Sequence, residues 1–198
     1  MSLRIPPVGL VLLGIVSVQG GAGIAKSLFD DVTPTALTWL RLTCSALILV
    51  AIARPWTRAS TRSRTDWLVA VAFGLALATM NWSIYQAFAR IPLGLAVTFE
   101  FVGPLTLAVL SSRRALDLVW VAVAGVGVAL LGVRDTDLDL GGVLFALLAG
   151  GAWASYILLS ARTGQRWEGL SGLAVASVIA AAVLAPAALA DHAGQLVH

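Results

Sequence analysis

The chain has 198 residues, of which 59% are hydrophobic and only 12% are Asp, Glu, Lys or Arg. A soluble domain carries about twice that share of charged residues, and so few charges cannot cover a soluble core. The composition therefore excludes a soluble enzyme, a disordered protein and a disulfide-rich secreted scaffold, and it predicts an integral membrane protein. The net charge of +3 comes from basic residues scattered in short gaps, which is not the pattern of a nucleic-acid-binding protein.

Seven apolar stretches follow one another along the chain with short gaps between them. A helix needs about 20 apolar residues to cross the hydrocarbon core of a bilayer, and most of these stretches have that length. The sequence therefore predicts an all-α integral membrane protein, a polytopic bundle of about seven transmembrane helices. The predicted spans are residues 5–25, 32–53, 67–89, 91–112, 118–133, 140–161 and 169–190, of which the fifth is short.

Basic residues gather in alternate gaps between the predicted helices. Numbered from the N-terminus, the odd gaps hold nine basic residues and the even gaps hold three. Cytoplasmic loops of membrane proteins carry the excess of Lys and Arg, so we expect a cytoplasmic N-terminus and an external C-terminus. The residues of the odd gaps are Arg4, Arg54, Arg58, Arg62, Arg64, Arg113, Arg114, Arg162 and Arg166.

Small residues recur at four-residue spacing on the sixth predicted helix, at Gly142, Ala146, Gly150 and Ala154. Such a stripe lets two helix backbones approach closely in lipid. We interpret it as packing within the chain; the alternative is the contact face of a homodimer.

Polar residues on four different predicted helices lie at a similar depth. At about 1.5 Å per residue from the outer ends, Gln19 and Arg41 lie about 10 Å deep, and Asn81 and Glu100 about 13 Å deep. Polar groups are costly in hydrocarbon, and transporters bind their substrates near the midplane. The shared depth therefore predicts a polar cavity between the midplane and the outer third of the bilayer, with Tyr85 nearer its mouth.

Arg41 and Glu100 carry opposite charges at comparable depth. One interpretation is a structural ion pair that neutralises both side chains. The other is that Glu100 faces the cavity and binds the ammonium group of a substrate or a proton. The candidate substrate-binding residues are Gln19, Asn81, Tyr85 and Glu100, while Arg41 has a structural or charge-pairing role. For each of the nearby aromatic residues, packing against lipid or another helix is favoured over lining the cavity: Trp39, Trp82, Tyr85, Trp153 and Tyr156.

Short motifs recur from the first predicted helix to the fifth. They are residues 19–26 (QGGAGIAK), 34–42 (PTALTWLRL), 81–89 (NWSIYQAFA), 90–94 (RIPLG), 100–105 (EFVGPL), 111–114 (SSRR) and 130–132 (LLG). These motifs resemble the EamA domain of the drug/metabolite transporter superfamily. The segments RIPLG and EFVGPL in particular resemble the threonine/homoserine exporter branch.

The resemblance implies ten helices in two inverted five-helix repeats around a central substrate cavity. Residues 5–133 would form the first repeat, and residues 140–190 would form the first two helices of a second. The last three helices of that pattern have no counterpart here. We therefore expect either a fragment of a longer gene product, incomplete at its C-terminal side, or a truncated protein.

The resemblance also implies a function. We expect an inner-membrane transporter that exports small amino acids such as threonine and homoserine by alternating access, coupled to protons. The alternatives are a truncated membrane protein that transports nothing, or a drug/metabolite transporter for another substrate class such as nucleosides. We expect no enzymatic activity, no metal and no cofactor; the expected partners are a small-molecule substrate and the lipid of a bacterial plasma membrane.

Overall fold

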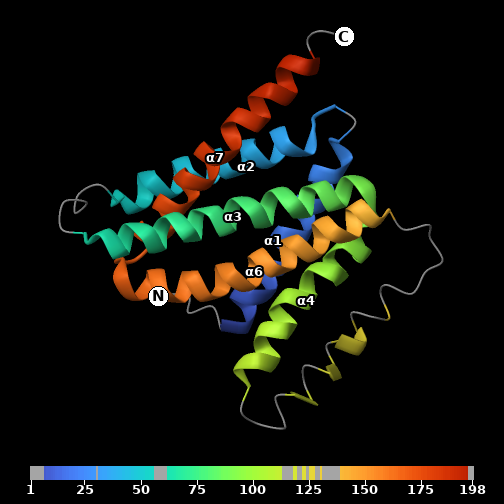
Figure 1. Cartoon of the computed structure of the whole chain (residues 1–198), viewed down its shortest axis with the longest axis horizontal. Coiled ribbons are helices and arrows are strands. Elements are labelled where there is room, and N and C mark those ends of the chain that lie inside the picture. The colour runs from blue at the N-terminus through green and yellow to red at the C-terminus, as the bar shows by residue number, and fades with distance from the viewer. Residues whose placement is uncertain are drawn as a thin grey trace. The chain divides into compact units, whose positions relative to one another are not determined.

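The computed structural model describes residues 7–29, 31–55, 62–112, 118–119, 122–123, 125–127, 130 and 139–195. Its helices are α1 (Pro7–Ser27), α2 (Pro34–Ala53), α3 (Arg64–Arg90), α4 (Leu93–Ser111), α6 (Leu140–Arg166) and α7 (Ser171–Gln195) (Figure 1). Within this part of the chain five helices, α2, α3, α4, α6 and α7, are long and apolar enough to cross a membrane. The predicted all-α polytopic membrane protein is confirmed. Half of the predicted fifth helix, at residues 118–133, lies outside the described residues.

Several helices are longer than the apolar stretches that predicted them. α3 begins at Arg64, because the hydroxyl of Ser63 accepts a hydrogen bond from the Asp66 backbone N–H at 3.2 Å. The Asp66 carboxylate accepts one in return from the Ser63 backbone N–H at 3.0 Å. This reciprocal capping satisfies two N–H groups at the helix start. α6 likewise begins directly after the capping residue Asp139 and continues to Arg166. Polar residues therefore extend both helices past the limits of the hydrophobic pattern.

α3 is the central helix of the unit formed by residues 34–198, which is described here separately from α1. It contacts α2 and α7 on one side and α4 and α6 on the other (Figure 1). α7 runs parallel to α3, since Ala70 packs with Val175 in one cluster and Leu77 with Ala180 in another. α6 runs antiparallel to α3, since Phe73 packs on Tyr156 and, further along α3, Trp82 packs on Phe145, with ring centroids 5.1 and 5.4 Å apart. We call the two ends of this unit the Arg64 end and the Arg90 end.

α4 and α6 cross at a contact between two glycines. A Cβ atom added to Gly150 would lie 2.5 Å from the carbonyl oxygen of Glu100 and 3.2 Å from the backbone nitrogen of Gly103. A Cβ atom added to Gly103 would overlap the carbonyl group of Gly150. Glycine is therefore required on both helices for the backbones to approach this closely. The stripe of small residues on α6 packs within the chain, as the sequence analysis favoured.

The Arg64 end is closed by a compact cluster of charged and aromatic side chains. Arg166 donates to the Asp66 carboxylate at 2.9 Å, joining the end of α6 to the start of α3. Trp167 donates from its indole N–H to the Asp66 carbonyl oxygen at 3.4 Å and meets Trp67 edge-on, with centroids 5.4 Å apart. The guanidinium of Arg62 lies 4.8 Å from the Trp167 ring centroid and donates to the Arg166 carbonyl oxygen. These contacts bind the first predicted repeat to the second.

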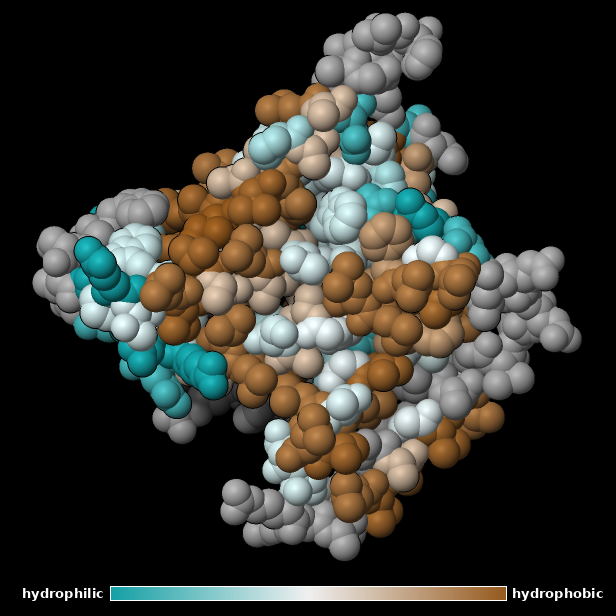
Figure 2. Space-filling model, in the orientation of Figure 1, coloured by the Kyte–Doolittle hydropathy of each residue, from teal (hydrophilic) through white to brown (hydrophobic). Residues whose placement is uncertain are grey.

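Apolar side chains cover large continuous areas of the face shown in Figure 2. Hydrophilic side chains gather where α3 begins and α6 ends, on the left of that view. Large exposed apolar residues lie along α2 at Leu40, Leu47, Ile48 and Ile52. Exposed apolar surface on this scale suits contact with lipid or with other helices rather than with water.

Candidate functional site

Arg41 on α2 and Tyr85 on α3 meet between their two helices. The Nη1 atom of Arg41 donates a hydrogen bond to the Tyr85 hydroxyl oxygen at 3.1 Å. The guanidinium carbon lies 5.8 Å from the centroid of the Tyr85 ring, within the range of a cation–π interaction. Two of the residues expected in the polar layer are therefore in direct contact, and the Arg41 guanidinium is bound to a neutral phenol.

The Tyr85 side chain is well fixed. It is 2% exposed, and its ring packs against that of Phe88 at 5.8 Å between centroids. Because a tyrosine has few rotatable bonds, burial of the ring also fixes the position of the hydroxyl. Tyr85 thus presents its hydroxyl to Arg41 from a rigid support.

Glu100 lies on α4, half-buried, one turn before the glycine crossing with α6. Its carbonyl oxygen forms part of that crossing at Gly150. Glu100 thus contributes an acidic side chain whose charge is opposite to that of Arg41 on α2.

Asn81 is buried on α3, one turn from Tyr85. Its side-chain nitrogen donates to the Leu77 carbonyl oxygen at 2.9 Å, a bond within its own helix. The side-chain oxygen of Asn81 can accept a hydrogen bond from a donor such as an ammonium ion.

Gln19 lies on α1 and its side chain is exposed. α1 belongs to a different unit of the chain from α2, α3, α4, α6 and α7. The place of Gln19 in the site therefore stays a prediction, based on its position along the first predicted helix.

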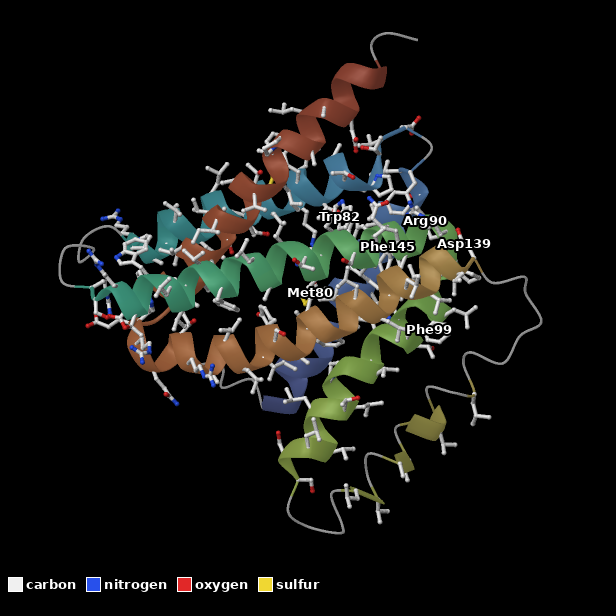
Figure 3. The ribbon with its side chains drawn as sticks, viewed as in Figure 1. Met80, Trp82, Arg90, Phe99, Asp139 and Phe145 are labelled. Atoms are coloured by element: carbon white, nitrogen blue, oxygen red, sulfur yellow. The ribbon has the colours of Figure 1, made fainter. Side chains whose placement is uncertain are left out.

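A second polar cluster lies at the Arg90 end, around Thr35 of α2. The Thr35 hydroxyl oxygen accepts hydrogen bonds from Gln86 Nε2 at 3.1 Å and from Trp82 Nε1 at 3.3 Å. Gln86 in turn accepts from Arg90 at 2.8 Å through its side-chain oxygen and at 2.7 Å through its backbone oxygen. Arg90 and Trp82 both pack on Phe145 of α6, where the labelled side chains come together in Figure 3.

The sequence analysis missed Thr35 as the centre of this cluster. The available signal was the spacing of Trp82, Gln86 and Arg90, which recur every four residues and so share a face of α3. A threonine on a membrane helix commonly bonds to its own backbone, as Thr38 does to the Pro34 carbonyl oxygen at 2.7 Å. The hydropathy pattern does not distinguish a threonine that bonds to its own backbone, such as Thr38, from one that accepts hydrogen bonds from another helix, such as Thr35.

The aromatic residues named with the cavity pack against rings or aliphatic side chains of other helices. Trp153 meets Phe101 at 5.1 Å, joining α6 to α4, and Tyr156 meets Phe73 at the same distance, joining α6 to α3. Trp39 packs against the cluster that contains Leu42 and Leu184. Packing between helices, the role favoured for these residues, is what the structure shows.

Comparison with known proteins finds relatives along nearly the whole chain. It is 40% identical over 183 residues to the threonine/homoserine exporter RhtA of Escherichia coli K12, an alignment that covers 91% of this chain and 61% of that protein. It is 38% identical over 195 residues to the threonine/homoserine exporter RhtA of Salmonella typhimurium SL1344, covering 97% of this chain and 65% of that protein.

The chain thus spans somewhat less than two thirds of the length of these relatives. No family model matches it, and no solved structure matches it. The similarity to the two exporters nevertheless extends through every helix described above. The chain is therefore a sequence relative of the threonine/homoserine exporters, which confirms the resemblance drawn from its motifs.

Proposed function

We propose that the protein containing this chain exports small amino acids, such as threonine or homoserine, across the bacterial plasma membrane. The observation that carries the proposal is the 38–40% identity to two proteins named as threonine/homoserine exporters, over nearly all of this chain. The polar side chains of Arg41, Tyr85 and Glu100 support it, because polar groups within membrane helices commonly mark a substrate or ion pathway.

In this proposal the protein works by alternating access of two helical repeats around one site. Glu100 accepts the ammonium group of the amino acid or, in exchange, a proton. Gln19, Asn81 and Tyr85 offer hydrogen bonds within the site, to the substrate or to the side chains that bind it, and Arg41 balances the charge of Glu100 or of a substrate carboxylate. The N-terminus is cytoplasmic, so the Arg90 end, with the polar layer nearer to it, faces outward.

The test of this proposal is amino-acid efflux from loaded cells that carry the complete gene. Replacing Glu100 by Gln keeps the shape of the side chain and removes its charge and its proton. We expect threonine export to fall about tenfold or more, because a hydrogen bond to a charged group is lost from the site. Glu168→Gln is the matched control: Glu168 is the chain's second glutamate, is exposed after α6, and has no role in the proposed site.

The outcomes separate the alternatives clearly. Export that is unchanged in Glu100→Gln contradicts the role of Glu100. Cells that retain threonine and homoserine but release nucleosides favour the nucleoside alternative. Cells that release neither substrate, although the protein is inserted in the membrane, contradict the proposed function altogether.

A further inference from the structure

We infer that Arg41 is the anchor for a substrate carboxylate and that Tyr85 is a positioning residue that holds the Arg41 guanidinium for this task. The inference rests on the proposed function and assigns Tyr85 a role other than direct contact with the substrate. It also defines the substrate class: a small zwitterion with a free carboxylate.

The first argument is the geometry of the guanidinium. The bond to the Tyr85 hydroxyl uses Nη1. A guanidinium presents two edges that fit a carboxylate with two parallel hydrogen bonds, and one of them is formed by Nε and Nη2. Tyr85 therefore orients Arg41 through Nη1 and leaves the edge formed by Nε and Nη2 for a ligand.

The second argument is charge. A guanidinium paired directly with a carboxylate side chain would be largely neutralised before any ligand arrived. In the part of the chain that the structure describes, Arg41 donates to the Tyr85 hydroxyl and not to a carboxylate side chain. The positive charge of Arg41 therefore stays available for the carboxylate of a substrate, and the proposed function assigns the ammonium group to Glu100. One positive and one negative group suit the two ends of an amino acid.

The third argument is rigidity. Arginine has a long side chain whose freedom is lost when it binds a ligand, which weakens binding. Tyr85 is 2% exposed and its ring is packed on Phe88, so its hydroxyl offers Arg41 a fixed acceptor. The Arg41 side chain therefore loses its conformational freedom when the protein folds, and this loss does not weaken substrate binding.

The competing interpretation is that Arg41 only reaches toward the lipid headgroups. It lies about 10 Å from the Pro34 end of α2, a distance that a long basic side chain can partly span. In that case Arg41 is indifferent to the carboxylate of the substrate. The two interpretations therefore differ in a measurable property, the preference for threonine over an analogue that lacks the carboxylate.

The experiment uses the complete gene product in proteoliposomes and compares threonine with threoninol, the amino alcohol that lacks a carboxylate. The KM and kcat are measured for labelled threonine, and the inhibition constant is measured for threoninol. The variants are Tyr85→Phe, which keeps the ring and removes the hydroxyl, and Arg41→Lys, which keeps the charge and removes the planar fork. The controls are Tyr156→Phe, at the chain's other tyrosine, whose ring packs on Phe73, and Arg162→Lys near the end of α6.

We expect Tyr85→Phe to raise the KM for threonine about tenfold while kcat changes less than about twofold. Arg41→Lys should raise the KM for threonine by at least as much. The inhibition constant of threoninol should stay unchanged in both variants, and both controls should behave as wild type.

Two results would overturn the inference while leaving the proposed function intact. One is a wild-type protein that transports threonine but binds threoninol equally well. The other is a pair of variants that weaken threonine and threoninol by the same factor, as general damage to the fold would. If the wild type transports no amino acid at all, the proposed function fails and the inference fails with it.

Discussion

Trp167 is the residue on which the contacts of the Arg64 end converge. It is 3% exposed and touches Asp66, Trp67 and Arg62 through an N–H bond, an edge-on ring contact and a cation–π contact. Gly172 also lies against it, since an added Cβ there would come within 2.9 Å of the Trp167 Cβ. Truncating Trp167 therefore leaves a space that its neighbours cannot readily fill.

We expect Trp167→Ala to reduce the free energy of unfolding by about 3 kcal/mol, as large-to-small changes of buried aromatic residues do. The measurement is thermal unfolding of the purified protein in detergent. Trp153→Ala is the comparison, because Trp153 is only half-buried and contacts one ring, so its loss should be smaller. Equal losses for the two variants would show that the cluster at the Arg64 end has no special contribution.

At the scale of single residues, the sequence predicts a shared depth for the polar side chains but not which of them meet. Arg41 and Tyr85 both belonged to the predicted polar layer, and these two side chains are in contact. The shared depth could not show that Arg41 bonds to Tyr85 instead of pairing directly with Glu100, because depth does not fix the rotation of a helix about its axis. The same limit concealed the bonds that converge on Thr35.

At the scale of helices, the crossing of α4 and α6 depends on the absence of side chains at Gly103 and Gly150. The neighbouring Gly151 provides a strict comparison, since a Cβ atom added there meets nothing within 4 Å. The two positions are adjacent in one helix and differ in what a methyl group would touch.

We expect Gly150→Ala to destabilise the protein by more than about 1 kcal/mol, because the added carbon forces the backbones apart. Gly151→Ala should instead stabilise it by about 0.5–1 kcal/mol, since alanine favours the helical conformation over glycine. The measurement is the unfolding midpoint in detergent. Gly150→Ala with a midpoint equal to or above that of Gly151→Ala would contradict the close crossing.

The sequence predicted most helices, although not where they end. Hydropathy marked residues 67–89, whereas α3 covers Arg64–Arg90, because the capping pair Ser63 and Asp66 is polar. The four-residue spacing of small residues predicted the contact face of α6 but not that its partner would be α4. Which helix packs against α6 depends on side chains that lie far apart in the sequence, so no local sequence pattern predicts it.

At the scale of the whole molecule, the uneven distribution of basic residues predicts which end of the bundle is cytoplasmic. Arg62, Arg64, Arg162 and Arg166 all lie at the Arg64 end. The exposed residue Glu168 follows α6 at that end, and the exposed residue Asp31 comes three positions before Pro34, the first residue of α2. Single cysteines at these two positions can therefore report the orientation.

In a cysteine-free background of the complete protein, which includes Cys44→Ser, we expect Asp31→Cys to react with a membrane-impermeant maleimide in intact cells. Glu168→Cys should react only after the cells are permeabilised. The physical reason is the tendency of Lys- and Arg-rich loops to remain in the cytoplasm. The reverse labelling pattern would overturn the proposed orientation, and with it the assignment of the Arg90 end to the outside.

The contact between Gly103 and Gly150 also has a mechanical meaning. Two backbones that touch without intervening side chains form a fulcrum, and a helix tilting about it moves each residue in proportion to its distance. Glu100 lies about 4.5 Å along α4 from that fulcrum and Ser111 about 12 Å. A tilt of α4 would therefore sweep its Ser111 end through an arc nearly three times as long as that of Glu100, so that this end of the helix moves far more than the carboxylate does.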